Sequence, residues 1–255
     1  MRTLVLLAAV SACSHPLVPA GSQLPSVSPA QASAAAPASA ASPAVASAAA
    51  PPGEAGFEFK VRADFFDGLR GDTAALDRAI QVCEEMLATH PDHPEAMVWH
   101  GAGMIGRSSL AFRGGDRATG MALYTKGLAE MDRAVELAPN NVGVRIPRGA
   151  VVLTTASFVP EPEKSRLLQR GVGDYEVALA AQAPRFKSLT LHAREQLLYG
   201  LTDGYAGLGN AAKAQVYYQR MLSDAAGSPL IPRARARAVG EVVAGQTPCE
   251  QCHGR

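Results

Sequence analysis

The sequence predicts an all-α domain built from antiparallel helix pairs. Between residues 57 and 245, apolar residues recur at spacings of three and four, the period of a helix with one buried face. Glycine, asparagine and proline interrupt these periodic segments where turns are expected. Alanine is abundant and only 5% of residues are aromatic, a composition that suits close helix-on-helix packing. The roughly 190 residues of this region are sufficient for one hydrophobic core.

Residues 1–12, MRTLVLLAAVSA, have the features of an export signal. Their apolar core, residues 4–10, follows a positive charge and is too short to span a bilayer. The sequence VSAC, which ends at Cys13, resembles the lipobox of bacterial lipoproteins. The resemblance implies that Cys13 is lipidated and that the protein is exported, as a periplasmic or outer-membrane-associated lipoprotein. The alternative is ordinary cleavage near Ala12 or Ala20, which leaves a free secreted protein.

Residues 13–55 are expected to form a disordered tether. Residues 14–53 contain no Asp, Glu, Lys or Arg and consist mainly of Ala, Ser and Pro. The repeated prolines interrupt any helix. Without large apolar side chains, burial cannot offset the entropy of ordering the chain. As a flexible coil this segment would reach on the order of 40 Å, enough to hold a domain clear of a membrane anchor.

The first helix pair is expected within residues 57–91. Its first helix ends at Gly71, and Asp72 suits the cap of the second helix. Ala79 occupies a position between the two helices where a small side chain is needed. Cys83 falls on the apolar face, which favours a core thiol over a reactive one.

The second pair, residues 94–139, and the third pair, residues 142–184, follow the same pattern but are longer. Gly101 and Gly149 fall on corresponding positions in the first helix of each pair. Pro147 lies inside the first helix of the third pair. Because proline removes a helical hydrogen bond, we expect it to kink this helix or to reset its start.

Residues 198–222 give the clearest pair. Gly209 suits the left-handed position that ends a helix, and Asn210 suits the cap of the next one. Ala214 lets the two helices approach closely. The large residues expected to pack across the pair are Leu198, Leu201, Tyr205, Tyr218 and Leu222. A last helix over residues 231–243 is expected to cap the array.

The spacing of these large and small residues resembles the tetratricopeptide repeat, most clearly in residues 198–222. The resemblance covers about residues 60–245 of the helical domain, which spans residues 56–245, in four units. It implies a solenoid of about four antiparallel helix pairs plus a capping helix, with one concave face that holds a peptide or protein. The second and third pairs depart from the family unit of about 34 residues because they are longer.

The tail, residues 246–255, carries the sharpest local motif. Cys249, Cys252 and His253 form the Cys-x-x-Cys-His pattern of c-type haem attachment. Two thiols one helical turn apart can bond to the two vinyl groups, and the adjacent imidazole can bind the iron. Alternatives for the tail are a Cys249–Cys252 disulfide, half of a shared metal site, or a remnant of a longer protein.

A haem on this tail would need its cover and its second axial ligand from the helical body or from a partner. Histidine is a common axial ligand of haem iron. His100 and His192 are candidate donors, together with several methionines, and the sequence does not distinguish between them.

Other chemistries find little support in the sequence. His90 and His93 could offer two metal nitrogens, although a polar turn between repeats is the simpler interpretation. Trp99 fits a core position better than a ligand platform. The basic residues between 233 and 237 are spread around a helix, which predicts a solvated face. No nucleotide-binding, hydrolase or metalloprotease motif is present in the sequence.

The sequence therefore favours a binding scaffold over an enzyme. A net charge of +1 and a pI near 7.7 do not suit a nucleic-acid-binding protein. We expect a tetratricopeptide-like module that holds a protein or peptide at the cell envelope without catalysis. The alternative is an electron-transfer protein that carries covalent c-type haem on its tail.

Overall fold

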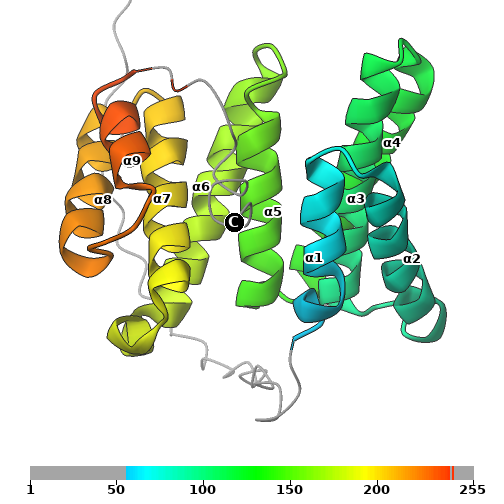
Figure 1. Cartoon of the computed structure of the whole chain (residues 1–255), viewed down its shortest axis with the longest axis horizontal. Coiled ribbons are helices and arrows are strands. Elements are labelled where there is room, and N and C mark those ends of the chain that lie inside the picture. The colour runs from blue at the N-terminus through cyan, green and yellow to red at the C-terminus, as the bar shows by residue number, and fades with distance from the viewer. Residues whose placement is uncertain (1–55, 242, 244–255) are drawn as a thin grey trace, which may run out of the picture. The chain divides into compact units, whose positions relative to one another are not determined.

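The computed structural model describes residues 56–241 and residue 243, and this part of the chain is entirely helical (Figure 1). Its elements are α1 (Glu58–Leu69), α2 (Thr73–Thr89), α3 (Pro94–Arg113), α4 (Arg117–Leu137), α5 (Val142–Thr155), α6 (Glu163–Gln182), the 3-10 helix η1 (Ala183–Ser188), α7 (Leu191–Gly207), α8 (Ala211–Asp224) and α9 (Ile231–Ala238). The described residues contain no strand, which confirms the all-α prediction. The expected lipidation site Cys13 and the expected haem-binding residues Cys249, Cys252 and His253 lie outside the described residues.

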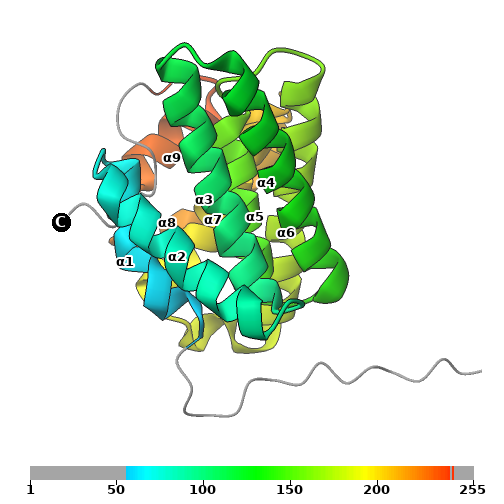
Figure 2. The same ribbon diagram turned by 90° about the vertical axis from the view of Figure 1, so that its right-hand side faces the viewer.

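Helices that follow one another in the chain pack together (Figures 1 and 2). The most extensive contacts join α1 to α2, α3 to α4, α5 to α6, and α7 to α8. The odd-numbered helices also contact one another in sequence, from α1 through α3, α5 and α7 to α9. Helices α1, α3, α5 and α7 therefore form a continuous layer, and this layer positions the candidate site.

The expected caps fix the starts of several helices. The side chains of Asp72, Asp116 and Asn210 accept hydrogen bonds from backbone N–H groups in the first turns of α2, α4 and α8. Each cap satisfies one of the backbone donors that a helix start leaves unpaired. Gly209 ends α7 with a φ of +72°, a left-handed conformation that glycine adopts without steric cost.

The closest approach between paired helices occurs where α3 crosses α4. A Cβ atom added to Gly101 would lie 2.7 Å from the carbonyl oxygen of Gly127, and a Cβ on Gly127 would lie 2.7 Å from the carbonyl oxygen of Gly101. Two backbones therefore meet here without an intervening side chain. This contact explains how such long helices, of 20 and 21 residues, stay closely packed.

Most of the residues expected to pack between helices are found inside the domain. Ala79, Leu201, Tyr205 and Ala214 are buried, Tyr218 is half-buried, and Gly149 lies against the ring of Tyr175.

Two expectations differ from the structure, and one of the two effects expected of Pro147 is absent. Leu222 is 40% exposed because Met221, its neighbour, takes the buried position on α8. Pro147 lies inside α5, which still begins at Val142, so the proline does not reset the helix start. The last helix ends at Ala238 instead of reaching residue 243, because Gly240 adopts a φ of +83°.

Candidate functional site

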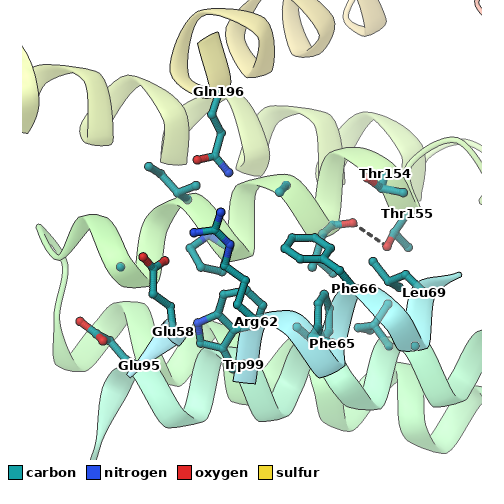
Figure 3. A pocket seen from close by; sticks show the side chains of 18 of the residues that line it. Glu58, Arg62, Phe65, Phe66, Leu69, Glu95, Trp99, Thr154, Thr155 and Gln196 are labelled. Atoms are coloured by element: carbon teal, nitrogen blue, oxygen red, sulfur yellow. Dashed lines mark hydrogen bonds between the residues drawn. The ribbon is translucent and has the colours of Figure 1, made fainter. Parts of the chain in front are cut away.

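A cavity of about 680 Å³ is lined mainly by residues of α1, α3, α5 and α7, with Tyr124 of α4, Gln182 of α6 and a few residues between helices (Figure 3). The volume lies within the range of roughly 300–1,000 Å³ that small-molecule and cofactor sites occupy. Gly56 and Gln196 are the first and last lining residues in the chain. The cavity is therefore assembled from segments that are far apart in the sequence.

Aromatic side chains are concentrated in the wall of the cavity. The chain has one Trp, six Tyr and seven Phe, and half of these fourteen residues line the cavity. They are Phe59, Phe65, Phe66, Trp99, Phe112, Tyr124 and Phe158. Phe59 is 63% exposed and Phe158 is 81% exposed, so apolar surface reaches solvent at the cavity. Exposed apolar surface of this kind marks binding sites in soluble proteins.

The two ends of the cavity differ in charge. Glu58, Arg62, Glu95 and Trp99 lie toward one end, whereas Phe66 and Leu69 lie toward the opposite end with the uncharged Thr154 and Thr155 (Figure 3). Glu58 and Glu95 belong to the first turns of α1 and α3. Helix starts carry a partial positive charge that stabilises carboxylates, which explains why acidic residues gather at this end.

Three half-buried polar side chains in the cavity wall have no hydrogen-bond partner among the described residues. They are Glu58 of α1, Thr154 of α5 and Gln196 of α7. Together they offer a carboxylate, a hydroxyl and an amide, and they come from three different helices. A ligand in the cavity would find donors and acceptors that are not already used by the protein.

Trp99 contributes both ring surface and an unused donor. Its side chain is buried against Phe65, with ring centroids 5.1 Å apart in an edge-to-face arrangement. The indole Nε1 is buried and has no hydrogen-bond partner within the described part of the chain. A buried donor without an acceptor costs about 1–3 kcal/mol. An acceptor atom that reached this nitrogen would remove that cost.

Glu95 also lines the cavity but has a structural task. Its Oε2 accepts a hydrogen bond from the Phe57 backbone N–H at 3.1 Å, and its Oε1 accepts one from Asn141 Nδ2 at 3.2 Å. Phe57 immediately precedes α1 and Asn141 caps α5. Glu95 therefore joins the starts of three cavity-lining helices.

The structure distinguishes the two histidines that the sequence left equivalent. His192 lines the cavity, and its Nδ1 lies 3.3 Å from Oε1 of Glu195, which is itself buried. His100 is not a cavity-lining residue. Its Nδ1 lies 2.8 Å from Glu130 Oε1, and its Nε2 lies 3.6 Å from Glu84 Oε1. Only His192 is placed to meet a ligand in the cavity.

The other candidate ligands are used within the fold. His93 Nδ1 accepts a hydrogen bond from the Ala96 backbone N–H and so caps α3, while His90 Nδ1 contacts the Thr89 hydroxyl. No cluster of three or more His, Cys, Asp or Glu side chains suited to a metal ion is found within residues 56–241 and 243. The turn interpretation of this segment therefore agrees with the contacts of both histidines.

Cys83 lies in the core and is 1% exposed. Burial, together with the nearby carboxylates of Glu130 and Glu84, raises the pKa of Cys83 to about 12. Because the thiolate is the reactive form of cysteine, this residue is an inert core side chain at neutral pH.

The prediction that the basic residues of α9 form a solvated face is wrong for two of its three arginines. Arg233 Nε donates to the Tyr199 hydroxyl at 2.8 Å, and Arg237 Nε donates to Asp203 Oδ1 at 2.5 Å. Both partners lie on α7, and only Arg235 is exposed. These arginines attach the last helix to the domain, a role that the regular spacing of two did not reveal.

Among the described residues, no helix is both long enough and apolar enough to cross a bilayer. Comparison of the chain with protein-family models, with curated proteins and with solved structures finds no match.

Proposed function

We propose that the helical domain is a tetratricopeptide-like binding module that holds an apolar segment of a partner protein in its cavity. The module would act at the cell envelope, held there by a lipid on Cys13. Binding would rest on shape and polar complementarity, and no covalent bond would be made or broken. The proposal for the envelope location rests on residues 1–13 alone.

The observation that carries the proposal is the composition of the cavity wall. Half of the aromatic residues of the chain gather there, and polar side chains without described partners lie on three of the helices. An extended peptide matches this combination, because its side chains can fill the aromatic surface while its backbone offers both N–H and C=O groups. The amide of Gln196 can donate to one of these groups and accept from the other.

Trp99 provides the test, since it is the one tryptophan of the chain and lines the cavity. Peptides are selected from a random library against the full chain, produced without attached haem. Their binding should change the tryptophan fluorescence of the chain. Replacement of Phe158 by alanine should then weaken binding about tenfold or more. Burial of a phenylalanine side chain is worth roughly 1.5–3 kcal/mol, and about 1.4 kcal/mol is a factor of ten in affinity.

Val216→Ala is the matched control, because Val216 is also exposed, at 57%, but is not a cavity-lining residue. Its affinity for the same peptides should equal that of the wild type. Equal binding by the wild type, by Phe158→Ala and by Gln196→Ala would place the binding site elsewhere and contradict the proposal.

The second candidate function is electron transfer by covalent haem on the tail. One observation favours it, namely that His192 faces an aromatic cavity and is backed by a buried carboxylate.

A further inference from the structure

We infer that the partner segment enters the cavity with an arginine that pairs with Glu58 and with apolar side chains that cover the opposite end. The inference rests on the proposed function and names the chemistry of the segment that the cavity would hold. Its starting point is Glu58 itself, a half-buried carboxylate of the cavity wall that has no partner among the described residues.

The charged end of the cavity, where Glu58, Arg62 and Glu95 lie, suits a cation better than an anion (Figure 3). These three residues are the Asp, Glu, Lys and Arg side chains among the described lining residues, two acids and one base. The Phe57 backbone N–H and the Asn141 amide, which donate to Glu95, are uncharged and leave its negative charge in place. An anion at this end would therefore meet two carboxylates, whereas a cation would meet one guanidinium.

The helix starts at this end do not reverse that preference. Glu58 and Glu95 lie in the first turns of α1 and α3, so the partial positive charges of these two helix starts already act on the two carboxylates. A half-buried carboxylate is costly unless it is paired and hydrogen-bonded. Arginine suits Glu58 better than lysine does, because its planar guanidinium donates two parallel hydrogen bonds to one carboxylate.

The length of the cavity sets the spacing between this arginine and the apolar residues of the partner. Glu58 and Leu69 are the first and last residues of α1, and both line the cavity. Helix α1 has 12 residues and is therefore about 18 Å long. An extended peptide rises about 3.3 Å per residue. About five or six residues of the partner thus span the distance from one end of the cavity to the other.

The opposite end offers apolar surface for the partner to cover. Leu69, Phe112 and Phe158 are exposed and line the cavity. They lie in or just beyond the last turns of α1, α3 and α5. Because burial of apolar surface drives association, an aromatic or aliphatic residue of the partner belongs here, about five or six positions from its arginine.

The test selects peptides from one random decapeptide library against the full wild-type chain and, in parallel, against Glu58→Lys. Selection by the wild type should enrich arginine about five or six positions from an aromatic or aliphatic residue. Selection by Glu58→Lys should enrich Asp or Glu at the position of the arginine, because the introduced ammonium group repels a guanidinium and attracts a carboxylate.

A second measurement needs no change in the protein. The best wild-type peptide is synthesised with arginine and with citrulline, which has a similar shape but no charge. The citrulline peptide should bind the wild type about tenfold more weakly, since a hydrogen bond to a charged group is lost. Glu58→Gln should bind the two peptides about equally, because the carboxylate that distinguishes them is absent.

Glu85→Gln is the control, since Glu85 is exposed and is not a cavity-lining residue. It should prefer the arginine peptide as strongly as the wild type does. Equal affinity of the wild type for the two peptides would overturn the inference, whatever the stability of the variants. An unchanged preference for arginine in a folded Glu58→Gln would do the same. If Phe158→Ala still weakens binding in these cases, the proposed function stands alone. A wild-type chain that selects no peptide would contradict the proposed function, and the inference with it.

Discussion

Asp174 lies at the centre of a charge network that joins α4, α5 and α6. It is completely buried on α6 and accepts hydrogen bonds from Arg145 Nη1, Arg148 Nε and Arg148 Nη2, each at 2.7 Å. Arg148 is also buried, and its Nη1 donates to Asp132 Oδ1 at 2.8 Å. A periodic apolar pattern cannot reveal such a network, because charged residues on a helix are usually assigned to its solvated face.

We expect Asp174→Ala to lower the free energy of unfolding by about 3–5 kcal/mol, since it leaves Arg148 buried without its main partner. Urea denaturation monitored by circular dichroism measures the change. Asp77→Ala is the control, because Asp77 is exposed and pairs with the exposed Arg107 at 2.7 Å. That exposed pair is worth about 0–1 kcal/mol. Similar losses in the two variants would show that burial of the network adds nothing.

Cys83 predicts a dependence of stability on alkaline pH. Its pKa rises from 9.0 to about 12 on folding, mainly through burial. The unfolded chain therefore loses the thiol proton first as the pH rises. The stability linked to this proton is complete below pH 9 and is lost between about pH 9 and pH 12. Between pH 8 and pH 10 the wild type should lose about 1 kcal/mol more than Cys83→Ala. Parallel curves for the two proteins would contradict the burial of the thiol.

At the scale of the helix, a pair of glycines sets the distance between α3 and α4. We expect Gly101→Ala to destabilise the protein by about 1–3 kcal/mol, because the new Cβ would lie 2.7 Å from the carbonyl oxygen of Gly127. Gly173→Ala is the matched control within α6, since a Cβ there meets nothing within 4 Å. The control should gain about 0.5–1 kcal/mol from better helix propensity. Thermal unfolding separates the two outcomes, and a neutral Gly101→Ala would contradict the close crossing.

Helix boundaries were predictable where one side chain decides them. Asp72 and Asn210 cap their helices as their chemistry suggested, because a short acceptor side chain satisfies a backbone donor that nothing else reaches. The end of α9 was not predictable from apolar spacing. Gly240 turns the chain, and the Glu241 N–H bonds back to the Ala236 carbonyl, which ends the helix at Ala238.

The choice between adjacent apolar residues also required the structure. Met221 and Leu222 are both suited to burial, yet only Met221 is buried on α8. Neighbouring residues on a helix point about 100° apart, so the packing of α8 against α7 and α9 decides which one faces inward.

At the scale of the whole domain, the cavity was not predictable from the sequence. Its wall joins residues from Gly56 to Gln196, and their meeting depends on how four odd-numbered helices lie against one another. Trp99 illustrates the problem. Its spacing indicated a core residue, which its 6% exposure agrees with, but the same side chain also forms part of the cavity wall.

The contacts of Glu95 have a consequence for the shape of the cavity at its charged end. The Glu95 carboxylate accepts hydrogen bonds from Phe57, just before α1, and from Asn141, at the start of α5. These bonds fix the spacing of the helix starts at the charged end of the cavity. At the other end of α5, the wall continues to Phe158, which is 81% exposed and lies beyond the last turn of the helix. If the cavity binds a ligand, differences in ligand length would be accommodated at the Phe158 end, and head groups would be distinguished at the Glu95 end.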